Sequence, residues 1–246
     1  MKKILLSVFL ICLLSSLYSQ EVLLDKDVQK QYKGKTGPNM RHYGHIYTSY
    51  GLVTDFDEEQ GTSIVWWRSG QYIFGYRYKL KLLSFYAIGL DLSYKRTGYY
   101  FEGVSENPFD PANPLTTNLE RDRHRLINNG VGIEFYHRIN FGRRGNTLGK
   151  YLDTGIRAQW NVADTESILI KDDDPDIPSQ RKRIKNRRLT YIMPFSYGLT
   201  ARIGFNKIII HANYRLSDYF KEEISSDVAV NIPETPRLAL GLQFAL

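Results

Sequence analysis

The sequence predicts an all-β protein: an eight-stranded antiparallel up-and-down β-barrel that crosses the bacterial outer membrane. Three observations lead to this prediction. Eight segments alternate apolar and polar residues, several of these segments are long, and a secretory signal precedes them. Side chains alternate between the two faces of a strand, and a tilted strand needs about nine to eleven residues to cross a bilayer.

Residues 1–19 are predicted to be a cleaved signal peptide. A positive start is followed by an apolar run from Ile4 to Leu14 and by small residues up to Ser19. This order is typical of secretory signals, and the run is too short for a membrane helix. The alternative, a lipoprotein anchored at Cys12, is disfavoured because the residue before it suits lipoprotein processing poorly.

The mature chain is predicted to have a periplasmic N-terminal tail, residues 20–39, and one barrel, residues 40–246. Its single cysteine leaves with the signal, which excludes disulfide and thiol chemistry from the mature protein. The full chain has 33 Lys+Arg against 26 Asp+Glu, and two of those lysines lie in the signal. The mildly basic balance comes without a nucleic-acid-binding module, so no nucleic-acid partner is expected.

The strands are predicted from segments in which one face is apolar or aromatic and the other is small or charged. In chain order the segments cover approximately 41–53, 71–82, 86–95, 127–139, 152–162, 190–204, 208–216 and 238–246.

The connections between these segments alternate in length. Short connections are expected at 83–84, 142–149 and 205–206, whereas long ones are expected at 101–121, 167–185 and 218–236, with one of medium length at 55–62. Short periplasmic turns and long extracellular loops are typical of outer-membrane barrels. Aromatic residues around the long connections indicate contact with partners or membrane, or an outer aromatic girdle. They are Tyr99, Tyr100, Phe101, Phe109, Tyr219 and Phe220.

The polar faces favour a membrane barrel over a soluble, lipocalin-like barrel, whose apolar face would point inward. Many glycines, for example Gly75, Gly89 and Gly241, share these faces with charged residues. Small residues beside charges suit the crowded interior of a narrow barrel, while the aromatic faces would meet lipid. The alternating C-terminal segment 238–246, with Phe244 near its end, indicates recognition by the barrel-assembly machinery, although the last residue is Leu rather than an aromatic.

Three C-terminal segments resemble the PorT-like outer-membrane barrels of the Bacteroidetes. The resemblance rests on Pro194–Leu199, Tyr214–Lys221 and Pro236–Leu242, and the signal ending in Ser19-Gln20 is similar to that of other secreted proteins of this phylum. It implies a barrel in the outer membrane. Some members of the family are associated with secretion and gliding machinery, and the family supplies no catalytic motif that could be carried over.

The inward face is predicted to carry a network of charges. Charges removed from water need partners, so the first interpretation is a packed plug in which Asp91, Glu134 and Asp153 pair with Arg77, Arg138 and Arg157. The alternative is a narrow, wet, anion-preferring lumen, because basic groups are in excess. The predicted network consists of Arg77, Asp91, Glu134, Arg138, Asp153, Arg157, Arg202 and Arg215.

A basic run in the third long connection is a candidate contact for the phosphates of lipopolysaccharide. The alternative is an ordinary solvated loop, and the preceding aspartates lack the ligand spacing of a calcium loop. The run comprises Arg181, Lys182, Arg183, Lys185, Arg187 and Arg188.

No enzyme is predicted, and no catalytic residue, cofactor or metal site is assigned. His42 and His45 fall on opposite faces of one strand and cannot easily share a metal, and no Ser-His-Asp spacing stands out. The sequence therefore predicts a structural or interaction subunit of the cell envelope, accessory to a process such as protein secretion. The alternative is a small anion-preferring channel or ligand-binding barrel. Expected partners are outer-membrane lipid, lipopolysaccharide, the assembly machinery and secretion or envelope proteins.

Overall fold

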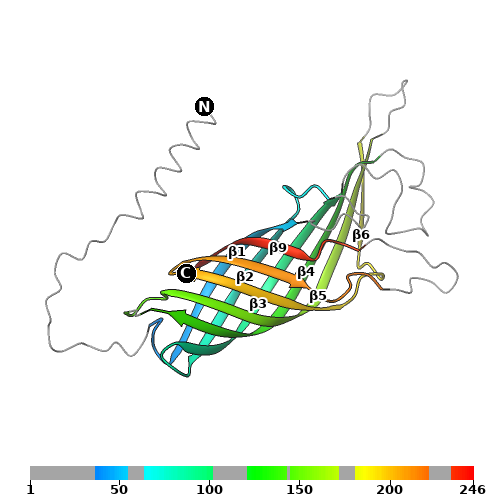
Figure 1. The fold of residues 1–246 in the computed structure, drawn as a ribbon. Helices are drawn as coiled ribbons and strands as arrows, with labels where there is room; N and C mark the ends of the chain where they lie inside the picture. Colours follow the sequence, from blue (N-terminus) through cyan, green and yellow to red (C-terminus); the bar gives the residue numbers. More distant parts are fainter. Residues whose placement is uncertain (1–36, 55–63, 102–120, 143–144, 172–180, 222–233) are drawn as a thin grey trace, which may run out of the picture. The chain divides into compact units, whose positions relative to one another are not determined.

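Nine β-strands form one antiparallel sheet that closes on itself in the computed structural model (Figure 1). The structure describes residues 37–54, 64–101, 121–142, 145–171, 181–221 and 234–246, so the predicted signal peptide and most of the N-terminal tail lie outside the described residues. The strands are β1 His42–Thr54, β2 Gly70–Lys81, β3 Tyr86–Phe101, β4 Arg121–Phe141, β5 Lys150–Lys171, β6 Arg181–Arg187, β7 Phe195–Phe205, β8 Ile208–Arg215 and β9 Leu238–Ala245.

Eight of the nine strands make the barrel wall. Each pairs with its neighbours in chain order, β4 pairs with β5, and β1 pairs with β9 to close the ring. The strand β6 lies outside this ring and pairs only with Thr165–Lys171 of β5, beyond the point where β5 leaves β7. The predicted eight-stranded antiparallel barrel is therefore confirmed.

The barrel is polar inside and apolar outside. Outward side chains such as Leu92, Ile156 and Trp160 expose 59%, 64% and 65% of their surface, whereas the inward Arg77 and Glu134 expose 0% and 1%. Soluble proteins rarely expose apolar patches larger than a few hundred Å². A lipocalin-like arrangement, with its apolar face inward, is excluded.

Three strands are clearly longer than the alternating pattern predicts: β3 continues to Phe101, and β4 and β5 are extended at both ends. β4 and β5 pair continuously from the turn at Gly142 to Ile170, except for two register shifts. At one of them Asn129 faces Ala163 and Gly130 faces Asn161, so Val162 is an extra residue in β5. A bulge reverses which residues face inward along the bulged strand. The alternation of apolar and polar residues therefore shifts by one position at the bulge, and the strand predicted over 152–162 ended there.

The predicted loop over 167–185 was wrong in part, because Arg181–Arg187 form β6 and pair with the end of β5. The predicted strand over 190–204 begins later, at Phe195. Tyr191 and Ile192 precede it and turn into the barrel mouth, where they expose 7% and 4% of their surface.

The short connections lie at the end of the barrel where the C-terminus lies (Figure 1). Asn206 joins β7 to β8 in the left-handed region, with φ of 59°, and Gly142 and Gly149 have φ of 73° and 68° at the β4–β5 connection. Asn and Gly tolerate this conformation best. No helix among the described residues is long and apolar enough to cross a membrane.

Candidate functional site

A layer of ion pairs fills the part of the barrel interior nearer the short connections. Arg77 Nη2 lies 2.9 Å from Asp91 Oδ2, and Arg138 Nε lies 2.7 Å from Asp153 Oδ1. Both pairs join residues that face each other in the strand register. Arg202 pairs with Glu134 and also approaches Asp153 Oδ2 at 3.5 Å. We call these six residues the ion-pair layer.

All three carboxylates that were expected to pair form ion pairs, but Arg157, one of the three expected basic partners, is not among their partners. Arg157 faces Glu134 in the register of β4 and β5, but Glu134 pairs with Arg202 of β7. Arg157 instead donates a hydrogen bond to Ser93. The strand register shows which groups face each other on neighbouring strands. It does not show which of two nearby guanidinium groups can reach a given carboxylate across the barrel interior.

Three inward tyrosines complete the ion-pair layer, and none of them was among the site residues predicted from the sequence. Tyr47 donates a hydrogen bond of 2.8 Å to Asp91 and lies 4.4 Å from the Arg77 guanidinium. The ring of Tyr151 lies 3.6 Å from the Arg138 guanidinium. A cation over an aromatic ring is attracted by the ring quadrupole. The signal was available, because Tyr136 follows Glu134 by two residues and therefore shares its inward face.

Glycines provide the space that these tyrosines need. A Cβ on Gly89 would clash with the Tyr136 ring, and one on Gly204 would clash with the Tyr151 ring. The glycines predicted to relieve crowding on the inward face therefore lie directly beneath large side chains.

The end of the barrel below the ion-pair layer is covered by the first described residues. Lys79 donates a hydrogen bond to the carbonyl of Pro38, and the Lys81 ammonium lies 2.8 Å from Asn39 Oδ1. Ile209, which is fully buried, packs in a small apolar cluster at this end with Leu148, Tyr151 and Ala245.

A polar cavity lies on the other side of the ion-pair layer. It offers about 50 Å³ to the centres of water-sized molecules. Polar side chains from six strands line it: Gln71, Lys95, Thr97, Asn128, Arg157, Gln159, Asn161, Ser196, Thr200, Asn213 and Arg215. The predicted network members Arg157 and Arg215 therefore line this cavity, outside the six residues of the ion-pair layer, and Arg215 Nη1 is 2.7 Å from Glu234 Oε1.

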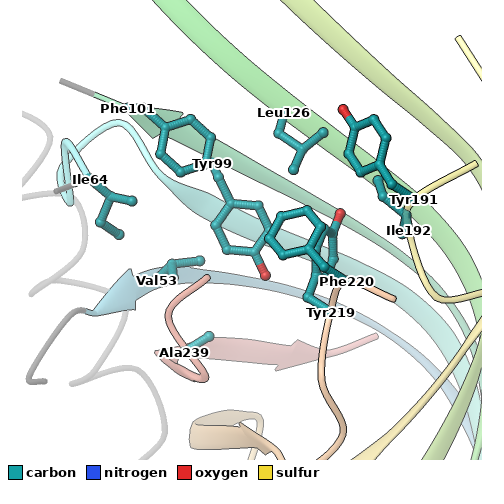
Figure 2. Close-up of a cluster of buried hydrophobic side chains, with 10 residues drawn as sticks. All are labelled: Val53, Ile64, Tyr99, Phe101, Leu126, Tyr191, Ile192, Tyr219, Phe220 and Ala239. Carbon is teal, nitrogen blue, oxygen red and sulfur yellow. The ribbon is translucent and has the colours of Figure 1, made fainter. Parts of the chain in front are cut away.

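A buried apolar cluster, whose side chains Figure 2 shows, lies at the barrel mouth. Tyr219 packs edge-on against Tyr99 and Phe220, with ring centroids 5.6 and 5.0 Å apart. Tyr99 and Tyr219 also line the cavity. We call this group the mouth cluster, and it comprises Val53, Ile64, Tyr99, Phe101, Leu126, Tyr191, Ile192, Tyr219, Phe220 and Ala239.

The mouth cluster corrects one expectation from the sequence. Tyr99, Phe101, Tyr219 and Phe220 were expected to contact partners or lipid, but each exposes 5% or less of its surface. Isolated bridges, such as that between Ile192 and Phe220, hold the connecting segments in the mouth. Phe109 lies outside the described residues.

Burial raises the pKa of the Tyr219 hydroxyl well above its usual value. Tyr219 lies outside the strands, and its hydroxyl has no hydrogen-bond partner. An unsatisfied buried hydroxyl destabilises the folded state.

Two of the histidines make buried polar contacts. His211 Nε2 and Ser49 Oγ share a hydrogen bond of 2.6 Å inside the barrel. His124 Nε2 lies 2.8 Å from Glu166 Oε1, but both side chains expose only 1% of their surface, so a substrate could not reach this pair. No group of three or more metal-ligating side chains occurs among the described residues.

The basic run forms one edge of the sheet above the barrel ring. Arg183, Lys185 and Arg187 alternate on one exposed face of β6, and Arg188 follows with φ of 57°. Asn186, on the opposite face, donates a hydrogen bond to Glu166. The backbones of Arg181 and Lys182 pair with β5, but their side chains lie outside the description.

No protein-family model matches the chain, and no curated protein is significantly similar to it in sequence.

Proposed function

We propose that the chain is a non-enzymatic β-barrel of the bacterial outer membrane that serves as a structural or interaction subunit of the cell envelope. The observation that carries this proposal is that the barrel is polar inside and apolar outside, the reverse of a soluble barrel: ion pairs are buried in the interior and apolar side chains are exposed on the exterior. Such an exterior is suited to lipid, and a closed barrel leaves no backbone edge unpaired in the membrane.

The positions of aromatic residues support a membrane belt. Tyr78 and His42 share a hydrogen bond of 2.6 Å near one end of the barrel, whereas Tyr94 donates one of 2.7 Å to Asn129 toward the other. The aliphatic side chains of Leu92 and Ile133, which face each other in the register of β3 and β4, lie between these levels on the outer face. Tyrosines with one polar end favour the boundary between lipid and water.

Quenching of tryptophan fluorescence in liposomes tests the location. Trp160 is kept as the single tryptophan by Trp66→Phe and Trp67→Phe, and the protein is reconstituted in lipids brominated on their acyl chains. We expect strong quenching by the brominated lipids and little by aqueous iodide. The reverse pattern would sink the membrane assignment.

The filled interior favours a scaffold over an open channel. The ion-pair layer and its tyrosines occupy the lumen between the polar cavity and the short connections. We therefore expect planar bilayers containing the refolded protein to remain silent, while heat-dependent gel migration verifies a folded barrel. Steady anion-selective openings that vanish on neutralising Arg77 and Arg157 would support the channel alternative instead.

The exposed residues at the mouth are the proposed contact surface. Trp66 and Trp67 expose 57% and 64% of their surface there, and the basic face of β6 extends beyond the ring. Guanidinium groups bind phosphate strongly, so we propose that Arg183, Lys185, Arg187 and Arg188 contact lipopolysaccharide, together with Arg181 and Lys182.

The contact is tested by changing these six residues to Gln. We expect less lipopolysaccharide to copurify with this variant than with a control in which Arg41, Lys150 and Lys207, which are exposed near the short-connection end, are changed to Gln. Equal retention in both variants would reject the contact.

The proposed relationship to the PorT-like barrels of the Bacteroidetes rests on the three C-terminal segments alone. It supports assistance to protein secretion as the envelope process, biogenesis through the barrel-assembly machinery, and secretion or envelope proteins as partners. Arrest of secretion on deletion of the gene, restored by the wild-type chain, is the expected result. Unchanged secretion would leave the barrel as a general envelope component and remove the secretion assignment.

A further inference from the structure

We propose that the polar cavity between the ion-pair layer and the mouth cluster binds a small oxyanion, of the size of phosphate or acetate, between Lys95 and Arg157. The described residues that line the cavity include the cationic Lys95, Arg157, Arg215 and Arg237 but no Asp or Glu. This site lies inside the barrel, enclosed by the wall strands, and the proposal does not depend on whether lipid or water surrounds the barrel.

Two of these four cations are neutralised by partners from the mouth. Arg215 pairs with Glu234 and Arg237 Nη2 with Asp218 Oδ1, both at 2.7 Å. Their charges therefore need no ligand.

Lys95 is not neutralised in this way. Its position in β3, between the buried Ser93 and Thr97, directs it into the barrel, where it is half-buried and lines the cavity. Among the described residues it has neither a hydrogen bond nor a carboxylate within ion-pair distance. An ammonium that is partly removed from bulk water and has no counter-charge is unfavourable, and an anion in the cavity would supply that counter-charge.

Arg157 supplies the second half of the site. It exposes 5% of its surface, its Nη2 donates to Ser93, and its Nε has no hydrogen-bond partner. The nearest carboxylates in the register, Glu134 and Asp91, already pair with Arg202 and Arg77. An unpaired, buried guanidinium N–H beside an unpaired ammonium is a strong combination for an anion.

Size and neutral groups restrict the ligand to a small oxyanion. The cavity has about 50 Å³ for the centres of water-sized molecules, and one water needs roughly 10–15 Å³. The hydroxyl of Thr200, which is buried without a partner, also lines it. The mouth cluster covers the cavity through Tyr99 and Tyr219, so a free ion fits better than one end of a long ligand.

Urea unfolding of the refolded protein in detergent, followed by tryptophan fluorescence, tests this proposal. Sodium phosphate or sodium acetate is titrated at constant ionic strength against sodium gluconate, whose anion is too large for the cavity. We expect a saturable rise of the unfolding midpoint with phosphate or acetate, because a ligand of the folded state stabilises it by mass action.

Variants then assign the effect to the site. Lys95→Met should lose the response to the small anions and unfold at a higher urea concentration than the wild type in gluconate alone. Arg157→Met should weaken the apparent affinity about tenfold or more, as expected for losing a charged hydrogen bond. Lys207→Met, in the exposed β7–β8 connection, is the matched control and should respond like the wild type.

Two results would overturn the proposal: a wild-type midpoint that small anions leave unchanged, or a Lys95→Met variant that responds like the wild type. A second measurement covers the case in which Lys95→Met does not refold. The ³¹P resonance of inorganic phosphate should broaden in the presence of the wild-type protein and sharpen again with excess acetate, and an unbroadened line would also reject the site.

Discussion

The two halves of the barrel interior are filled by different means. Toward the short connections, ion pairs and tyrosines come from the strands themselves, and Arg77, Asp91, Arg138 and Asp153 meet across neighbouring strands. Toward the mouth, the mouth cluster is assembled from strand ends and connecting residues such as Ile64, Tyr191 and Phe220.

This difference shows how each half is specified. Once the strands are in register, the strand pairing alone places the charges of neighbouring strands opposite each other. The mouth cluster instead requires connecting segments to turn back into the barrel, where burial of apolar surface holds them. We therefore expect changes in the ion-pair layer to affect the whole barrel and changes in the mouth cluster to act more locally.

The largest effect is expected from breaking one pair in the ion-pair layer. Arg77→Met leaves Asp91 buried without its guanidinium, which should lower the free energy of unfolding by about 3–5 kcal/mol. The double variant Arg77→Met, Asp91→Leu removes both charges and should recover much of this loss. Urea unfolding in detergent measures both, and a double variant as unstable as the single one would contradict the pairing.

A smaller effect is expected from a cavity in the mouth cluster. Leu126 is fully buried in this cluster, and Leu126→Ala should cost about 2 kcal/mol, the lower end of the usual range, because the mouth can partly collapse around the gap. Leu83→Ala, in the exposed β2–β3 connection, is the control and should stay within about 0.5 kcal/mol of the wild type. A loss for Leu126→Ala as large as that for Arg77→Met would remove the proposed contrast between the two halves.

Removing the unsatisfied hydroxyl of the mouth cluster should stabilise the protein. Tyr219→Phe keeps the ring contacts and is expected to raise the free energy of unfolding by about 1 kcal/mol at neutral pH. Because burial raises the pKa of Tyr219, the unfolded state ionises first as the pH passes about 10, and wild-type stability falls there. The gain from Tyr219→Phe should therefore grow above that pH. A variant less stable than the wild type would indicate that the hydroxyl has a partner.

The smallest effect is expected on the basic face of β6. Arg183→Gln removes an exposed charge and should change the free energy of unfolding by less than about 0.5 kcal/mol. A larger loss would indicate that β6 stabilises the barrel and is more than a contact surface.

The residues that the sequence predicted well are those whose neighbours are set by strand alternation. The eight wall strands and the inward direction of the charged residues follow from a period of two. The pairs Arg77–Asp91 and Arg138–Asp153 depend in addition on the strand register, which the alternating pattern does not give. The prediction ended where that period breaks, at the bulge beside Val162, and so it missed the extended β5 and the pairing of β6. It also missed the inward course of Tyr219 and Phe220, because connecting segments have no periodicity from which their direction can be read.

The closure of the barrel has a consequence for its synthesis. Tyr47 in β1 pairs with Ala245 in β9. One edge of β1 therefore stays unpaired until β9 has been synthesised. Contacts this distant in sequence form slowly and leave strand edges exposed to other chains in the meantime. A nascent or truncated chain lacking β9 would retain two open edges, and it therefore depends on protection from aggregation until its last residues are available.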